Sequence, residues 1–213
     1  MQRKIIKVCG MREPGNIREV ESLEIDLLGF IFYPGSSRYV GDSCESADAI
    51  RGCTKPKVGV FVNEPIEIIL ERAARCRLDL IQLHGDETPS LCHDLRKLGY
   101  TVIKALSISS KDDFVKTDYY TDCCDYYLFD TKCIGYGGSG QRFDWALLDE
   151  YKGNTPFILS GGLTCDCIDD LRQINHDEFA GIDINSGFEI SPAIKDTGKL
   201  KSFIEKIHEI IDN

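Results

Sequence analysis

A cysteine, a histidine and an aspartate each stand where an apolar run of the sequence stops. Cys9 ends "KIIKVC", His84 follows "LIQL", and Asp130 closes "YYLFD". These three residue types can exchange protons when their surroundings adjust their pKa values. A cysteine must be a thiolate part of the time to act as a base, and an aspartate must keep its proton to act as an acid. The set is therefore a candidate for general acid–base catalysis.

Each of the three residues also has a structural interpretation. Cys9 can be a small buried hydrophobe, because free cysteine is among the most buried residue types. Asp130 can cap the turn or helix after its strand. His84 competes with Cys9 for the role of base, although a single histidine at a strand end more often orients a neighbour through a hydrogen bond. The residues alone leave these alternatives open.

Two glycine-containing segments late in the chain are typical of a phosphate site. They are "SGGL" at 160–163 and "NSGFE" at 185–189. Glycine lets the backbone approach an anion closely, and backbone N–H groups bind phosphate without a positively charged side chain. If these glycines do more than make turns, we expect a phosphorylated small molecule to be bound by Gly161, Gly162, Asn185, Ser186 and Gly187.

The elements that must position these residues alternate along the whole chain. Apolar, β-branched runs predict strands at 4–10, 27–32, 57–62, 80–85, 101–106, 126–130, 157–162 and 181–187. Amphipathic patterns between and after them predict helices, most clearly at 64–76, 88–99 and 199–211.

Eight strands, each followed by a helix or a helix-length segment, predict parallel pairing with right-handed crossovers. We therefore expect residues 1–213 to form a single (β/α)8 TIM barrel, for which about 200 residues is the compact limit. In that fold the chemistry lies at the carboxyl ends of the strands, and loops after strands seven and eight often bind phosphate. An open doubly wound sheet is the alternative, but "CGMREPGN" lacks the glycine fingerprint usual after its first strand.

Composition narrows the class of protein. The 213 residues carry a net charge of −10 without a basic stripe, which argues against nucleic acid and anionic membranes as partners. No apolar run approaches the roughly 20 residues that span a bilayer, and no signal peptide is recognisable. Ten cysteines at irregular spacings favour reduced thiols in the cytoplasm, and "CC" and "CDC" lack zinc-site spacing. We expect no metal.

An ordered set of motifs resembles the phosphoribosylanthranilate isomerase family of tryptophan biosynthesis. The motifs are "KVCGM", "GFIFYPGSSRYV", "VGVFVNE", "IQLHG", "LFDTK", "YGGSGQRFDW", "LSGGL" and "GIDINSG", spread from residue 4 to about 190. The resemblance implies a (β/α)8 barrel that carries out an Amadori rearrangement without metal or organic cofactor. It also implies a small phosphorylated substrate and a monomer or homodimer.

The resemblance also implies roles for individual residues. Cys9 would be the general base and Asp130 the general acid, and Arg38 would hold the anthranilate end of the substrate. Gln82, His84 and Asp183 complete the expected substrate-binding set. The chain departs from the family in having "NSG" where many relatives carry a serine pair. The segment 110–125 matches no motif, and "YGGSG" at 136–140 is either a plain loop or a lid over the site.

A buried ion pair is expected beneath Cys9. Side chains alternate along a strand, so Lys7 and Cys9 share a face, as do Asp183 and Asn185. Barrel closure places the eighth strand beside the first, and an unpaired ammonium is costly inside a protein. We therefore expect Lys7 to pair with Asp183 and to lower the pKa of the Cys9 thiol. Otherwise Lys7 would extend to the open bottom of the barrel.

Two other functions remain open. One is another phosphosugar barrel of the ribulose-phosphate epimerase type, whose chemistry usually requires a metal held by histidine and aspartate. The other is a non-catalytic, thiol-rich barrel that binds a ligand or senses oxidants, supported only by the adjacent cysteines at 123–124.

Overall fold

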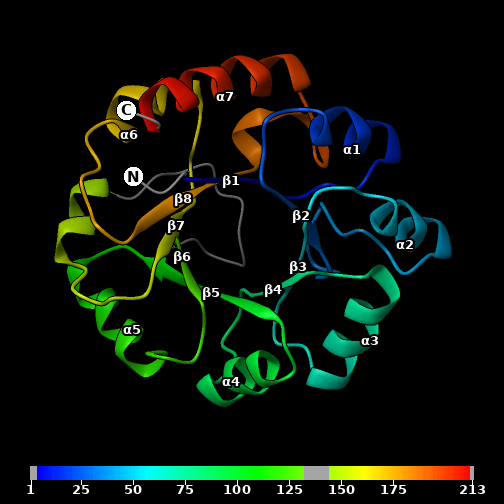
Figure 1. Ribbon diagram of the computed structural model, residues 1–213, viewed down its shortest axis with the longest axis horizontal. Coiled ribbons are helices and arrows are strands. Elements are labelled where there is room, and N and C mark those ends of the chain that lie inside the picture. The colour runs from blue at the N-terminus through cyan, green and yellow to red at the C-terminus, as the bar shows by residue number, and fades with distance from the viewer. Residues whose placement is uncertain (1–3, 132–143, 212–213) are drawn as a thin grey trace.

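The computed structural model describes residues 4–131 and 144–211. Eight parallel strands close into a barrel in chain order, and helices surround it (Figure 1). The strands are β1 (Ile5–Val8), β2 (Leu27–Ile31), β3 (Lys57–Phe61), β4 (Leu80–Leu83), β5 (Thr101–Ile108), β6 (Tyr126–Thr131), β7 (Phe157–Leu159) and β8 (Phe179–Ile184). The predicted (β/α)8 barrel is confirmed, with each strand at its expected place.

The outer ring consists of α-helices and short 3-10 helices, in which α7 packs beside α1 (Figure 1). The α-helices are α1 (Pro14–Glu21), α2 (Cys44–Arg51), α3 (Ile66–Cys76), α4 (Pro89–Lys97), α5 (Val115–Tyr119), α6 (Ile168–Leu171) and α7 (Thr197–Ile211). The 3-10 helices are η1 (Lys111–Phe114), η2 (Trp145–Glu150), η3 (Cys165–Cys167) and η4 (Ser186–Phe188). The segment 110–125 thus supplies η1 and α5.

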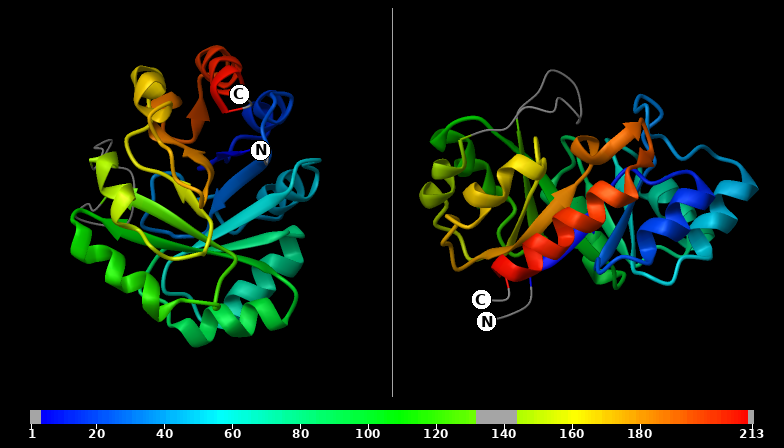
Figure 2. Two further views of the ribbon diagram at one scale, coloured as in Figure 1. Left: turned by 60° about the vertical axis from the view of Figure 1, so that its left-hand side comes forward. Right: turned by 90° about the horizontal axis from the view of Figure 1, so that it is seen from above.

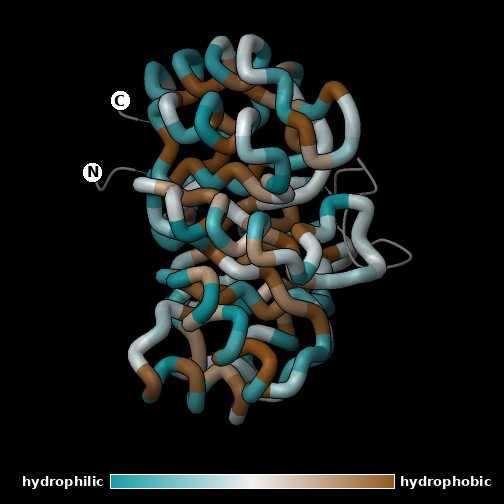
Figure 3. The backbone as a smooth tube through the Cα atoms, turned by 90° about the vertical axis from the view of Figure 1, so that its right-hand side faces the viewer, coloured by the Kyte–Doolittle hydropathy of each residue, from teal (hydrophilic) through white to brown (hydrophobic). Residues whose placement is uncertain are grey.

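Alternation of side chains along the strands separates two apolar regions. The barrel interior contains a small cluster of Leu27, Val58, Ile103, Ala105, Leu128 and Ile158. A larger core fills the space between the strands and the helices. Figure 3 shows hydrophobic and hydrophilic residues alternating along the backbone of the strands and helices. Buried polar side chains such as Lys7, Gln82 and Asp183 interrupt the interior and lie beneath the site.

A two-stranded antiparallel hairpin between β8 and α7 was not expected from the sequence. It consists of β9 (Glu189–Ser191) and β10 (Ile194–Lys195), coloured orange in Figure 2. The side-chain amide of Asn16 on α1 binds the hairpin at Lys195. The Asn16 side-chain oxygen accepts a hydrogen bond from the backbone N–H of Lys195 at 2.7 Å. The Asn16 side-chain nitrogen donates to the Lys195 carbonyl at 2.9 Å. The hairpin is therefore anchored to the helix that follows β1.

The cysteines and the lengths of the helices can be stated for the described residues. The nine cysteines within these residues are free, and most of them are buried, whereas Cys133 lies outside the described residues. In the part of the chain that the structure describes, none of the helices combines the length and apolar character needed to cross a bilayer.

Candidate active site

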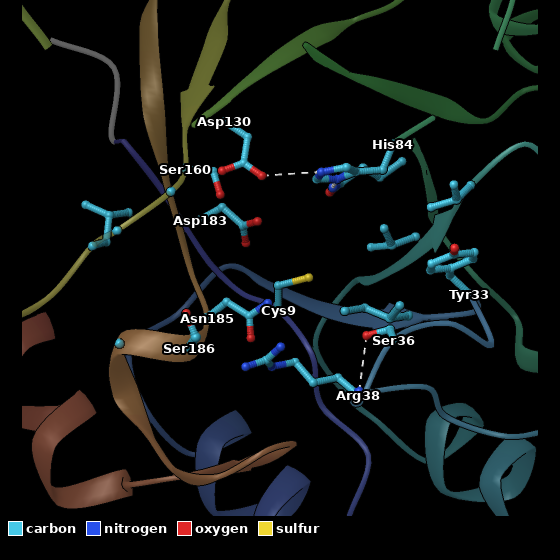
Figure 4. Close-up of a pocket in the computed structure, with 18 residues that line it drawn as sticks. Cys9, Tyr33, Ser36, Arg38, His84, Asp130, Ser160, Asp183, Asn185 and Ser186 are labelled. Atoms are coloured by element: carbon cyan, nitrogen blue, oxygen red, sulfur yellow. Dashed lines mark hydrogen bonds and ion pairs between the residues drawn. The ribbon is translucent and has the colours of Figure 1, made fainter. Parts of the chain in front are cut away.

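A single pocket at the carboxyl ends of the strands gathers every predicted site residue (Figure 4). These residues are Cys9, Arg38, Gln82, His84, Asp130, Gly161, Gly162, Asp183, Asn185, Ser186 and Gly187. They come from six strand ends that are separated along the chain by as many as 178 positions, and barrel closure brings them together.

The thiol of Cys9 points into this pocket (Figure 4). The backbone N–H of Cys9 donates to the carbonyl of Ile184 at 2.8 Å, which fixes it against β8. On the other side, a Cβ on Gly29 of β2 would come within 2.8 Å of the Cys9 sulfur. Glycine at that position therefore leaves the space that the thiol occupies. Cys9 is only 3% exposed, so it is both a buried residue and a pocket residue.

The predicted ion pair beneath Cys9 is confirmed. Lys7 Nζ lies 2.8 Å from Asp183 Oδ1, both side chains are buried, and the two residues are register partners across β1 and β8. Burial alone would lower the pKa of Lys7, but Asp183 and Cys9 raise it above its ordinary value, so the ammonium stays charged.

The expected effect of this pair on Cys9 is only partly correct. Burial raises the pKa of the Cys9 thiol above its ordinary value, and Lys7 and Lys195 oppose that rise. Lys7 therefore shifts the pKa of Cys9 in the predicted direction. The prediction that this pKa lies below its ordinary value was wrong, because it lies above. The reason is the depth of burial, because removal from water disfavours the thiolate more than the lysines favour it.

Asp130, His84 and Gln82 form a chain of polar contacts on the opposite side of the pocket. The amide nitrogen of Gln82 lies 2.9 Å from His84 Nδ1, so this ring nitrogen accepts and the proton resides on Nε2. Nε2 lies 3.4 Å from Asp130 Oδ2. The other carboxylate oxygen of Asp130 accepts from the N–H of Thr131 at 2.8 Å. Asp130 thus has a local backbone contact, as a capping aspartate would, and also faces the pocket.

Arg38 is held by a carboxylate that the sequence did not reveal. Its Nε donates to Glu189 at 2.8 and 3.0 Å, and its Nη2 donates to Glu189 Oε2 at 2.7 Å. Lys195, which is fully buried, donates to Glu189 Oε1 at 2.6 Å and to Asn185 Oδ1 at 2.8 Å. The Asn185 side chain consequently lies beside Arg38 and Cys9 (Figure 4), so its amide is engaged away from the proposed phosphate site.

The two glycine segments lie together at the other end of the pocket. Gly161 and Gly162 adopt left-handed backbone angles, with φ of 85° and 66°. Their N–H groups donate to no other group among the described residues. Gly187 packs so closely on the carbonyl of Leu163 that a Cβ would overlap it, which joins the loops after β7 and β8. Unengaged N–H groups in consecutive left-handed residues are suited to bind an anion.

The pocket is also lined by residues to which the sequence analysis gave no individual role: Ile31, Tyr33, Ser36, Val60, Val62, Ser160 and Leu163. Tyr33 directly follows the predicted strand 27–32, and Ser160 directly follows β7 as the structure has it, so both stand at strand ends as Asp130 does. Glu189 and Lys195 had no such signal. The glycines at 136–140 lie outside the described residues, as does their suggested role as a lid. Within the described ranges, no three His, Cys, Asp or Glu side chains are grouped to hold a metal.

Comparison with known proteins gives a consistent result. The family model for N-(5'-phosphoribosyl)anthranilate (PRA) isomerase matches residues 6–206. An N-(5'-phosphoribosyl)anthranilate isomerase of Parabacteroides distasonis is 54% identical over 206 residues, which cover 95% of this chain and 93% of that relative. The enzyme of Phocaeicola vulgatus is 49% identical over 207 residues, which cover 97% and 99%.

Solved structures agree in fold and in the extent of the match. Phosphoribosyl anthranilate isomerase from Thermotoga maritima is 33% identical, has a TM-score of 0.83, and covers 97% of this chain and 99% of its own. Another phosphoribosyl anthranilate isomerase structure, 30% identical with a TM-score of 0.80 and the same coverage, contains reduced 1-(o-carboxyphenylamino)-1-deoxyribulose 5-phosphate. Because the family model and the relatives match nearly the whole length, the chain belongs to the N-(5'-phosphoribosyl)anthranilate isomerase family.

Proposed function

We propose that this chain converts N-(5'-phosphoribosyl)anthranilate to 1-(2-carboxyphenylamino)-1-deoxyribulose 5-phosphate in tryptophan biosynthesis, with Cys9 as general base and Asp130 as general acid. One observation carries the proposal. A buried thiol and a carboxylate face the same pocket, between a glycine cradle at one end and an arginine at the other (Figure 4). This arrangement matches a substrate with a phosphate at one end and an aryl carboxylate at the other.

The reaction requires two proton transfers. Asp130 gives its proton to the furanose oxygen, the ring C–O bond breaks, and the anthranilate nitrogen forms a double bond to C1. The Cys9 thiolate then removes the proton from C2, and the electron pair moves through C1 to the nitrogen. The resulting enolamine becomes the ketose as its hydroxyl proton is lost and C1 gains a proton. Side chains provide both transfers, so we expect no metal or organic cofactor.

The remaining pocket residues position the substrate between these two groups. Gly161, Gly162, Ser186 and Gly187 would bind the phosphate through backbone N–H groups. The buried Oε1 of Gln82 has no hydrogen-bond partner among the described residues, so it is available to accept from a ribose hydroxyl. His84 would orient Asp130 through its Nε2 proton. We further propose a cytoplasmic enzyme that acts as a monomer or homodimer.

The direct test is incubation with N-(5'-phosphoribosyl)anthranilate, whose fluorescence should fall as product forms. Activity should persist after incubation with EDTA, since no step passes through a metal. An epimerase of the metal-dependent type would instead lose activity on ribulose 5-phosphate under chelation. An enzyme that leaves the fluorescence unchanged would refute the proposed function.

The phosphate site leads to a separate prediction. Inorganic phosphate should inhibit competitively, and Gly187→Ala should raise its inhibition constant and the KM of the substrate by similar factors. The reason is that a methyl group at Gly187 would displace the loop after β7. Gly15→Ala is the control, because a Cβ on α1 at that position meets nothing within 4 Å. If only the substrate KM changes, the anion is bound elsewhere.

A further inference from the structure

Arg38, which would bind the aryl carboxylate of the substrate, is already paired with a carboxylate of the protein. An arginine that must attract a carboxylate already has one, since Glu189 occupies its Nε and Nη2. Two carboxylates on one guanidinium would repel each other unless they use different edges and another cation balances the charge. Both conditions hold in this structure.

The first condition is an open edge. Glu189 takes the Nε–Nη2 side of the guanidinium, and Nη1 has no hydrogen-bond partner among the described residues. Arg38 lines the pocket, and its guanidinium lies on the side of Cys9 (Figure 4). A planar guanidinium can pair with two carboxylates at once because its five N–H donors point in fixed directions.

The second condition is the extra cation. Lys195 donates to Glu189 and to Asn185, both acceptors, from a fully buried position. Burial alone would raise the pKa of Glu189, but hydrogen bonds from Arg38 and Lys195 hold it below its ordinary value, so the carboxylate is ionised. Burial lowers the pKa of Lys195 below its ordinary value, although its ion pair with Glu189 opposes that shift. With Lys195 protonated, two cations and one anion give the cluster one net positive charge. Without Lys195 the cluster would be neutral.

We propose that Glu189 and Lys195, carried by the β9–β10 hairpin, are positioning residues that make Arg38 a rigid, net-positive receptor for the aryl carboxylate of the substrate. The inference rests on the proposed function. It assigns to the hairpin the selection of carboxylated over uncarboxylated arylamines. Glu189 acts through the guanidinium of Arg38, and Lys195 acts through Glu189 while also favouring the thiolate of Cys9. Lys195 also fixes the Asn185 amide next to the same guanidinium.

The test compares two ligands that differ only in the carboxylate. One is reduced 1-(o-carboxyphenylamino)-1-deoxyribulose 5-phosphate, and the other is its phenylamino counterpart. Wild type should bind the carboxylated compound more tightly. Lys195→Met should weaken it by about tenfold to a hundredfold, the usual worth of charge-assisted hydrogen bonds. Glu189→Gln should weaken it by less, because the lost anchor of the guanidinium is partly offset by the loss of a competing negative charge. The uncarboxylated compound should be bound equally by all variants. In Glu189→Gln, kcat should change less than KM, whereas Lys195→Met also removes a cation that favours the Cys9 thiolate, so its kcat should fall as well.

Matched controls keep the outcome interpretable. Glu205→Gln and Lys201→Met make the same chemical changes on the exposed face of α7 and should leave both affinities unaltered. In an Arg38→Ala background, Glu189→Gln should produce no further loss of selectivity, because both act on one contact. Should Lys195→Met fail to fold, Glu189→Gln decides alone.

Equal weakening of both ligands, or a full Glu189→Gln effect without Arg38, would overturn the inference. Equal binding of both ligands by an active wild type would also overturn it, while leaving the proposed function intact. Failure of the proposed function appears separately, as a wild type that does not consume N-(5'-phosphoribosyl)anthranilate.

Discussion

Cys9→Ser and Asp130→Asn should each lower kcat by at least about a hundredfold, the usual contribution of a positioned general acid or base. A serine hydroxyl remains protonated at neutral pH, so it cannot remove the proton from C2. An asparagine amide cannot donate its proton to the furanose oxygen. The KM should change much less, because neither side chain belongs to the phosphate cradle or to the Arg38 cluster. Steady-state kinetics with the fluorescent substrate measure both quantities.

Two conservative variants serve as controls for this prediction. Cys53→Ser alters another buried cysteine that lies outside the pocket, and Asp94→Asn alters an exposed aspartate on α4. Both should retain wild-type kcat. If Cys9→Ser keeps most of its activity instead, the cysteine is a buried hydrophobe at the end of β1, and the base must be another residue, with His84 the first candidate.

Local sequence patterns were sufficient to predict the barrel and most of the residues at the carboxyl ends of its strands. Parallel strands in a closed barrel all end at the same face, so a polar residue after an apolar run can be placed without a structure. This reasoning located Cys9, His84 and Asp130. It also predicted the Lys7–Asp183 pair, because alternation and closure fix which side chains share the interior.

The hairpin could not be predicted in the same way. Its strands have three and two residues, too short for an alternating pattern, and Ile190 and Ile194 are exposed. Its position depends on the clamp between Asn16 and Lys195, which are 179 residues apart. The net rise in the Cys9 pKa likewise depends on the burial of Cys9 between Gly29 and β8. No local sequence pattern predicts how deeply a side chain is buried.

A second buried ion pair, between Lys104 and Glu87, was also predictable from the sequence. Lys104 interrupts an apolar strand as Lys7 does, and it lies 3.0 Å from Glu87, with both side chains 1% exposed. Glu87 also accepts hydrogen bonds from the N–H groups of Gly85 and Asn63. The pair therefore fixes the loop that begins at His84. In β1 and in β5 alike, a lysine inside an apolar strand is paired with a buried carboxylate.

Lys7→Met should raise the pKa of Cys9 further and slow catalysis. Three charged groups act on this thiol: Lys7 on β1, Asp183 on β8 and Lys195 on β10. Removal of Lys7 deletes the cation that most favours the thiolate. Burial raises the pKa of Asp183, so this carboxyl tends to take up a proton once Lys7 is gone, and the lost cation dominates the effect. With the thiolate as the proposed base, kcat/KM should rise as the pH rises through the Cys9 pKa. In the variant this rise should occur at higher pH, so activity at neutral pH should fall.

The pKa itself is best measured by alkylation of Cys9 with iodoacetamide as a function of pH. Mass spectrometry of the Cys9 peptide is required, since nine other cysteines would obscure a bulk assay. Lys104→Met is the matched control, because it removes another fully buried lysine paired with a carboxylate but lies outside the pocket. It should lower stability without moving the Cys9 titration. If Lys7→Met also leaves that titration and the activity unchanged, Lys7 serves only to balance Asp183, and the thiolate must be favoured by Lys195 or by the bound substrate.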